Sequence, residues 1–149
     1  MGFSESVRHV LGNYVTFAGR APRSEFWWFQ LFYFMAGFVA GALDAVVFGL
    51  GPESAAVFAP LLSLGLLLPS LAVLARRLHD IDRTAWWILL FFVPVVGAVV
   101  ILIFAVLRGT EGPNRFGPDP LGGPGAGTGG GGAAYADDVR SSSVPTVGR

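Results

Sequence analysis

The sequence contains no cysteine and no lysine, and its two histidines, His9 and His79, lie far apart. Without cysteine there is no disulfide framework, no thiolate metal site and no cysteine nucleophile. Two isolated histidines offer too few ligands for a metal ion, so we expect neither a metal nor a cofactor. Ten arginines balance ten acidic residues. A chain without net charge does not attract nucleic acid through its overall field.

Charged residues are scarce. They make up 13% of the 149 residues, whereas 53% are hydrophobic. Soluble domains usually carry about 25% charged residues, so the chain has too little polar surface for an ordinary soluble domain. We therefore expect an all-α membrane protein. The sequence also lacks paired carboxylates, a phosphate-binding loop in its structural context and metal-ligand spacing, and we expect no enzymatic activity.

Three apolar runs dominate the chain. Residues 26–43 carry no charge and the pattern continues to residue 50, while residues 55–75 and 86–107 are also free of charge. Each run has about the 20 residues that a helix needs to cross a hydrocarbon core of about 30 Å. The sequence therefore predicts three transmembrane helices. The main alternative is that one of the runs is broken into a re-entrant pair.

The segment before the first run, residues 1–25, lacks the apolar core of a cleaved signal peptide. Within it, Phe3, Val7 and Val10 recur at helical spacing, opposite polar residues that include Arg8. This pattern predicts a short amphipathic helix on the membrane surface. A helix packed on the rest of the protein is the alternative.

The end of the chain differs in composition from the rest. Residues 108–120 are dense in turn formers, and residues 121–149 are rich in Gly, Ala and Ser. Such a tail buries too little apolar surface to become ordered. The chain thus divides into an N-terminal amphipathic segment (1–25), a three-span membrane domain (26–120) and a tail that we predict to be disordered.

Arginine is distributed unevenly around the runs. Three arginines lie before the first run and three between the second and third runs, but none lies in the connection at residues 51–53. Positive charge near the ends of spans stays in the cytoplasm. We therefore expect a cytoplasmic N-terminus and second loop. Three spans would then place the C-terminus outside, although Arg108 and Arg115 favour the opposite side.

Small and acidic residues occur inside the first run. Gly37 and Gly41 form a Gly-x-x-x-Gly pair, which lets two helices approach closely. We interpret the pair as packing within the chain, with homodimerisation as the alternative. Asp44 lies near the outer end of the run, where a carboxylate either reaches the headgroups or marks an ion path.

Two prolines lie inside the second and third runs. Pro69 and Pro94 each remove a helical donor and clash with the carbonyl four residues earlier, which is that of Gly65 and of Leu90. We interpret the prolines as residues that only set packing angles. The alternative is that both helices bend at the same depth and open a shallow cavity on the cytoplasmic side.

The loop between the second and third runs places charged and aromatic residues beside the membrane. Guanidinium groups suit lipid phosphates, and tryptophan suits the interface. Residues 20–25 should meet the same surface, so we expect the two segments to form one ion-pair network; a plain topology signal is the alternative. The candidates for binding lipid or a partner protein are Arg20, Arg23, Glu25, Arg76, Arg77, His79, Asp80, Trp86 and Trp87.

Several motifs follow one another in a fixed order: residues 17–27, residues 68–73 leading into 76–80, Trp86-Trp87, Pro94, Gly97, Gly112, residues 114–117 and residues 119–120. Together they resemble the bacterial DUF805 membrane family over about residues 10–120. The resemblance implies a small multi-pass protein of the bacterial inner membrane, and it supplies no activity, cofactor or catalytic residue. The chain departs from the family at residues 81–85, where the family typically has Thr-Gly-Arg-Ser-Gly.

These observations lead to two hypotheses about function. The first is a non-enzymatic integral membrane protein that binds anionic lipid or a partner membrane protein through a cytoplasmic surface of Arg, His and Trp. The second is a small oligomeric transporter or channel subunit that assembles around Gly37 and Gly41. In that case Asp44 and His79 would line a path formed between copies of the chain.

Overall fold

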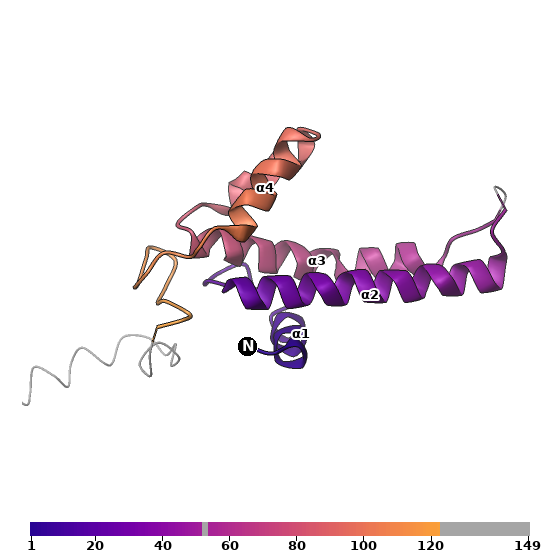
Figure 1. Ribbon diagram of the computed structural model, residues 1–149, viewed down its shortest axis with the longest axis horizontal. Coiled ribbons are helices and arrows are strands. Elements are labelled where there is room, and N and C mark those ends of the chain that lie inside the picture. The colour runs from indigo at the N-terminus through magenta and orange to yellow at the C-terminus, as the bar shows by residue number, and fades with distance from the viewer. Residues whose placement is uncertain (52–53, 123–149) are drawn as a thin grey trace, which may run out of the picture.

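A computed structural model of the protein describes residues 1–51 and 54–122. This part of the chain is helical, with one isolated β-bridge between Asn114 and Gly117. Figure 1 shows two long helices side by side, with a short helix across them and a pair of short helices at an angle to them. In chain order, the elements are α1 (Phe3–Gly12), α2 (Arg23–Phe48), α3 (Phe58–Asp80), the 3-10 helix η1 (Ala85–Phe92) and α4 (Val96–Val106). Residues 123–149, most of the predicted tail, lie outside the described residues.

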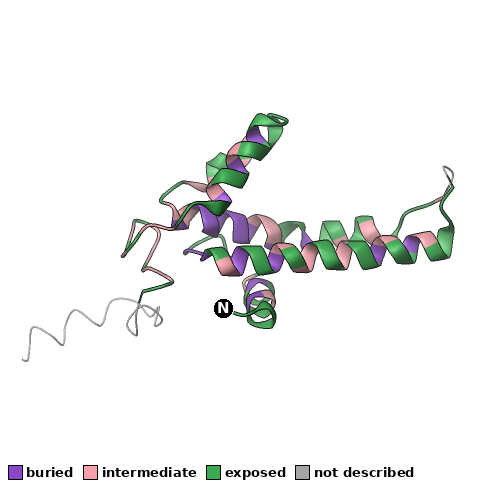
Figure 2. Ribbon diagram, viewed as in Figure 1, coloured by how far each residue is buried: buried purple, intermediate pink, exposed green. Residues whose placement is uncertain are grey.

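The two long helices, α2 and α3, correspond to the first two apolar runs. They have 26 and 23 residues, or about 39 Å and 35 Å at 1.5 Å per residue. Both are long and apolar enough to cross a membrane. Figure 2 shows that much of their surface is exposed, and Phe38 and Val46 on α2 are 80% and 83% exposed. An exposed apolar surface of this extent suits contact with lipid.

The third apolar run does not form one helix. η1 and α4 are separated at residues 93–95, where Val95 has a φ of 64°. Pro94 has no N–H for the carbonyl of Leu90, and the N–H of Val93 donates to that carbonyl at 2.8 Å instead. The 11 residues of α4 extend about 17 Å, which is too short for a hydrocarbon core of about 30 Å. A third transmembrane helix is therefore not confirmed, and the structure favours the alternative of a broken run.

η1 and α4 fold back on each other. The rings of Trp87 and Phe104 pack edge to face with centroids 5.3 Å apart. Where the two elements cross, a Cβ on Gly97 would overlap the carbonyl oxygen of Leu90, so this close approach requires glycine. The end of α4 returns to the end of α3, and its backbone accepts hydrogen bonds from α3. The segment after α4 thus lies at the end where α2 begins, which differs from the arrangement expected for three spans.

The turn between α3 and η1 keeps the left-handed backbone that glycine favours. Asp82 adopts it with a φ of 57°, in the segment where the chain departs from the family motif. Aspartate tolerates this conformation because its short polar side chain forms local hydrogen bonds. The turn therefore forms without glycine.

The predicted amphipathic helix is confirmed as α1, and it packs on the protein. Val10 is fully buried and joins a hydrophobic cluster with Phe29 of α2 and Val73 of α3. Phe3 contacts Trp28 edge to face, with ring centroids 5.9 Å apart. The helix therefore covers one face of the α2–α3 pair.

The segment after α1 compensates for the proline inside α3. Pro69 cannot donate to the carbonyl oxygen of Gly65. The hydroxyl of Tyr14 donates to this oxygen instead. Helix α3 continues through Pro69, whereas the apolar run that contains Pro94 is interrupted.

Candidate functional site

A network of buried charged side chains lies where α2 begins and α3 ends. It contains Arg20, Glu25, Arg76, Arg77 and Asp80, each of which exposes 8% or less of its surface. A charge removed from water must be paired and hydrogen-bonded inside the protein. The partners come from α1, from the start of α2 and the segment before it, from the end of α3, and from α4 and the segment after it.

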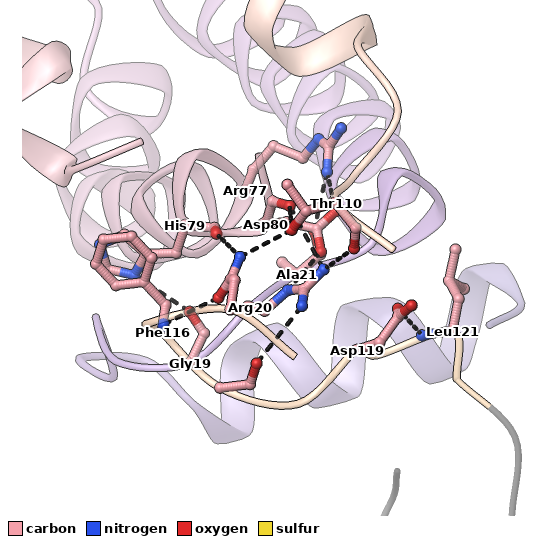
Figure 3. A network of polar contacts seen from close by, with 12 residues as sticks. Gly19, Arg20, Ala21, Arg77, His79, Asp80, Thr110, Phe116, Asp119 and Leu121 are labelled. Carbon is pink, nitrogen blue, oxygen red and sulfur yellow. Dashed lines mark hydrogen bonds and ion pairs between the residues drawn. The ribbon is translucent and has the colours of Figure 1, made fainter. Parts of the chain in front are cut away.

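Asp80 lies between two buried arginines (Figure 3). Its Oδ1 accepts a hydrogen bond from Nε of Arg20 at 2.9 Å, and its Oδ2 accepts one from Nη1 of Arg77. A Cβ on Gly109 would overlap the same carboxylate. A side chain at position 109 would therefore displace the carboxylate from its two arginines, and the site joins residues from three parts of the chain.

Backbone carbonyls bind the remaining donors of the two guanidinium groups. Arg20 donates to the carbonyl oxygens of Thr110 at 2.5 Å and Gly112 at 2.6 Å. Arg77 donates to the carbonyl oxygen of Leu107. These bonds fasten the segment after α4 to the residues before α2 and to the end of α3.

Glu25 forms a second centre in the network. Its Oε1 forms an ion pair with Nη1 of Arg76 at 2.8 Å and lies 3.0 Å from Nδ1 of His9. The Nε and Nη2 atoms of Arg76 are buried without a hydrogen-bond partner among the described residues. The contacts of Glu25 connect α1, α2 and α3 at one point.

His79 belongs to a layer that covers the network. Its ring stacks on that of Phe116, with centroids 3.9 Å apart and planes 4° apart. Nδ1 of His79 lies 3.1 Å from the carbonyl oxygen of Gly19 (Figure 3). The side-chain amide of Asn114 donates to the carbonyl oxygen of His79 at 2.8 Å. The turn that begins at Asn114 is thus held against the end of α3.

The expected ion-pair network between residues 20–25 and the end of α3 is confirmed by the pairs Arg20–Asp80 and Arg76–Glu25. The same contacts change the interpretation of these side chains. They were candidates for binding lipid or a partner, but they are buried and turned toward one another. A headgroup or a partner protein at the surface does not reach them in this structure.

Three of the candidate residues remain exposed: Arg23, Trp86 and Trp87. Arg23 donates to the carbonyl oxygen of Val106 at 3.4 Å. Arg83, which was not a candidate, is also exposed, with its guanidinium carbon 5.7 Å from the ring centroid of Trp87. Cationic and aromatic side chains therefore share the outer surface of this end.

Asp119 closes the segment after α4 on itself. Its carboxylate accepts hydrogen bonds from the backbone N–H groups of Leu121 at 2.9 Å and Gly112 at 3.0 Å. These two bonds favour the charged form and hold the pKa of Asp119 below its usual value. The turn therefore depends on an ionised side chain.

The glycine pair in α2 faces open space. A Cβ on Gly37 or Gly41 would meet no heavy atom within 4 Å, apart from the nearby backbone of its own helix. The pair therefore forms no close packing with another helix of the described chain. Contact with a second copy stays a prediction.

Asp44 caps α3. Its carboxylate accepts hydrogen bonds from the backbone N–H groups of Val57 and Phe58 at 2.8 Å and of Ala59 at 2.9 Å. The free N–H groups at the start of a helix are natural partners of a carboxylate. Because His79 is also engaged, the two side chains invoked for a transport path have structural contacts, and the structure does not support the transporter hypothesis.

Two hollows adjoin the network. A polar pocket of about 150 Å³ is lined in part by Arg23, Arg108 and Thr110. An apolar groove of about 230 Å³ lies between α2 and α4. Within residues 1–51 and 54–122, no group of three or more His, Asp or Glu side chains is placed to hold a metal ion.

Comparison with known proteins points to one family. The profile of DUF805, described as a protein of unknown function, matches residues 14–118. The chain is 45% identical over 111 residues to the inner membrane protein YhaH of Escherichia coli strain K12, a match that covers 74% of this chain and 92% of YhaH. It is also 45% identical over 111 residues to the inner membrane protein YhaI of that strain, covering 74% of this chain and 91% of YhaI. No solved structure matches the chain significantly. The chain therefore belongs to the DUF805 family of membrane proteins, whose function is unknown.

Proposed function

We propose that the protein is a non-enzymatic integral membrane protein that binds the headgroups of anionic phospholipids. The binding surface is the exposed surface of the end where α2 begins and α3 ends, which contains the buried charge network and is called the network end below. The contrast between two sets of arginines carries this proposal. Arg20, Arg76 and Arg77 are buried and paired with carboxylates. Arg23 and Arg83 are exposed, and neither forms an ion pair within the described chain. Guanidinium groups without a carboxylate suit the planar recognition of phosphate.

Tryptophan side chains support a position of this end at the membrane surface. Trp27 and Trp28 in the first turns of α2 are 41% and 38% exposed, and Trp86 and Trp87 in η1 are 76% and 37% exposed. Tryptophan accumulates at the level of the headgroups, where its apolar ring and polar N–H both find partners. A lipid headgroup near these rings is within reach of the exposed arginines.

We infer that α2 and α3 cross the bacterial inner membrane and that the η1–α4 pair enters it and returns on the network side. The described arginines lie in α1 and around the network, whereas the described part of the connection between α2 and α3 has none. By the positive-inside rule, the network end is cytoplasmic. We expect a fluorescent protein fused to the C-terminus to be fluorescent and alkaline phosphatase fused there to be inactive. Active phosphatase would contradict this topology.

Native mass spectrometry tests lipid binding directly. The full-length protein is released from nanodiscs that contain equal amounts of phosphatidylglycerol and phosphatidylcholine. We expect selective retention of phosphatidylglycerol, and we expect the combined changes Arg23→Gln, Arg83→Gln and Arg108→Gln to remove that selectivity. The three guanidinium groups are exposed, so the variant should still insert and fold.

The matched control is Arg115→Gln. Arg115 is exposed like the other three, but it donates two hydrogen bonds to Asp82, from Nε at 3.0 Å and from Nη2 at 2.9 Å. Among the described residues, Arg108 has only a single ion-pair contact, with Glu111, so selectivity should persist when Arg115 is replaced. Equal retention of the two lipids by the unchanged protein would refute the proposal. A discrete lipid-free oligomer, or a complex with another membrane protein, would instead favour a protein partner at this surface.

A further inference from the structure

The apolar groove between α2 and α4 has a lining that suits a hydrocarbon chain. Trp27 and Phe34 of α2 form one wall, and Ala98 and Leu102 of α4 form the other. Figure 1 shows that α4 leaves the α2–α3 pair at an angle. The groove has a volume of about 230 Å³. It is too small to accommodate a helix of another protein, which is about 10 Å across with its side chains.

A cationic side chain lies at one end of this groove. Arg23 precedes Trp27 by four residues and Phe34 by eleven, so the three share one face of α2. Nη1 of Arg23 lies 3.4 Å from the carbonyl oxygen of Val106, next to Ala105 in the groove lining. The groove therefore has its charge where α2 begins and α4 ends, and its apolar lining deeper along α2.

A separate polar pocket lies next to Arg23, and it shares no lining residue with the groove. Arg23 and Arg108 both line this pocket. Three carboxylates also border it, and each has other contacts: Asp80 binds two buried arginines, Asp119 accepts backbone N–H groups, and Glu111 forms an exposed pair with Arg108 at 3.2 Å. Exposed pairs contribute little and are readily exchanged. Arg23 therefore supplies the positive charge that no carboxylate of the described chain neutralises.

A single carboxamide lies in the groove. Gln30 is the only asparagine or glutamine of α2, and it lines the apolar groove about 10 Å along the helix from Arg23. A polar group at membrane depth is unfavourable unless it forms hydrogen bonds. The ester groups of a glycerophospholipid lie between its phosphate and its acyl chains, which is the order in which Arg23, Gln30 and the apolar walls follow one another.

We propose that this groove holds one anionic phospholipid, with its phosphate on Arg23 and Arg108, its ester region beside Gln30 and one acyl chain between α2 and α4. The proposal rests on the function proposed above and assigns that binding to a defined place. The complementary charge at the head of the groove and the apolar lining along it select a lipid over a soluble anion. Arg83, near Trp87, lies outside this site.

Two variants test the site, one at each end. Arg23→Gln removes the charge, and Ala98→Phe fills the groove at an exposed position of α4. Apparent dissociation constants are measured by native mass spectrometry, with phosphatidylglycerol titrated into phosphatidylcholine nanodiscs. We expect each variant to bind phosphatidylglycerol about tenfold more weakly, because a hydrogen bond to a charged group is lost in one and the seat for the chain in the other. The matched control is Ala42→Phe, which adds the same ring to an exposed position of α2 away from the groove.

The outcomes separate this inference from the proposed function. If neither variant weakens binding but Arg83→Gln does, the protein binds anionic lipid elsewhere and the groove is the wrong site. If the unchanged protein shows no preference for phosphatidylglycerol, the proposed function and the groove site both fail. If Ala42→Phe weakens binding as much as Ala98→Phe, the effect is not specific to the groove, and the inference is overturned.

Fluorescence gives a test on the folded protein without filling the groove. Phosphatidylglycerol with brominated acyl chains should quench tryptophan emission more strongly than brominated phosphatidylcholine at the same mole fraction, because Trp27 lines the groove. Replacement of Trp27 by Phe should remove this difference, whereas replacement of Trp28 by Phe should preserve it. A difference that persists without Trp27 would overturn the groove assignment.

Discussion

The two ends of the α2–α3 pair hold buried charge in different ways. At the end where α2 begins, Asp80 binds Arg20 and Arg77, and backbone carbonyls from the segment after α4 complete the contacts. At the other end, Asp44 exposes 6% of its surface, forms no ion pair within the described chain and accepts three N–H groups from the start of α3. One end joins segments from three parts of the chain, and the other joins two helices that follow one another along the chain.

This difference follows from the number of hydrogen bonds that each group requires. A carboxylate is an acceptor, and the first turn of a helix offers a set of free N–H groups that point toward it. A guanidinium group has five N–H donors, more than the residues beside it in a helix can accept. Arg20 and Arg77 therefore bind carbonyl oxygens from a third part of the chain.

The largest effect should come from the network end. We expect Asp80→Asn to lower the free energy of unfolding by about 3 to 5 kcal/mol, because it leaves two buried guanidinium groups without their shared carboxylate. Chemical unfolding in detergent micelles, followed by circular dichroism, measures the change. The exposed pair Asp82–Arg115 provides the control, and Asp82→Asn should change the free energy by less than about 1 kcal/mol. Equal effects of the two changes would remove the contrast between buried and exposed charge.

A smaller effect should come from the opposite end. Asp44→Ala removes the cap of α3 and should destabilise the protein by about 0.5 to 2 kcal/mol. Asp44→Asn should retain most of the stability, because asparagine also accepts hydrogen bonds at a helix start. The same unfolding measurement compares the two variants. A loss in Asp44→Asn as large as in Asp44→Ala would show that the charge itself is needed.

Between the two ends, the hydrogen bond from Tyr14 to Gly65 joins two neutral groups, and its loss should lower the free energy of unfolding only slightly. Tyr14→Phe should cost about 1 kcal/mol, because the carbonyl oxygen of Gly65 loses its donor. In a Pro69→Ala background the cost should shrink, because the restored N–H at position 69 then donates to Gly65. A double-mutant cycle measures this coupling. Purely additive effects of the two substitutions would show that Tyr14 does not compensate for the proline.

The smallest effect concerns Asp119, at the edge of the network end. Its folded-state pKa lies below the ordinary value of 3.8, so its stabilising contribution is complete above that value and is lost as the pH falls through the lower folded-state pKa. Hydrogen exchange of the Gly112 and Leu121 amides should accelerate, relative to exchange in an unstructured peptide, over this acidic range. In Asp119→Asn the pH-dependent part should disappear. An unchanged profile in the variant would assign the dependence to another group.

The sequence predicted the elements that depend on local composition. The two long apolar runs predicted α2 and α3, and the helical spacing of Phe3 and Val10 predicted α1. The sequence predicts a broken run only as an alternative and does not say which run is broken, because Pro69 and Pro94 give the same local signal. The outcome differs because Gly65 finds the hydroxyl of Tyr14, a contact between distant residues that no local pattern contains.

The sequence predicted the charged side chains of the site but not the backbone carbonyl oxygens that accept their hydrogen bonds. The ion pairs between residues 20–25 and the end of α3 followed from shared placement beside the membrane. The carbonyl oxygens of Leu107, Thr110 and Gly112 carry no side-chain signature, so the sequence did not predict them. With these acceptors unknown, the arginines were expected to face lipid. The family motifs at Gly112 and residues 114–117 were the one signal in the sequence that this segment contributes to the structure.

The last partners of the network are also the last to be synthesised. Arg20 and Arg77 leave the ribosome well before Thr110 and Gly112, whose carbonyl oxygens Arg20 requires, and before Leu107, which Arg77 requires. Until that segment emerges, the two arginines have unfilled donors and keep contact with water. The tertiary structure of this end is therefore completed after α2 and α3 have been made, and a chain that stops before residue 107 would present these arginines to the quality-control proteases of the membrane.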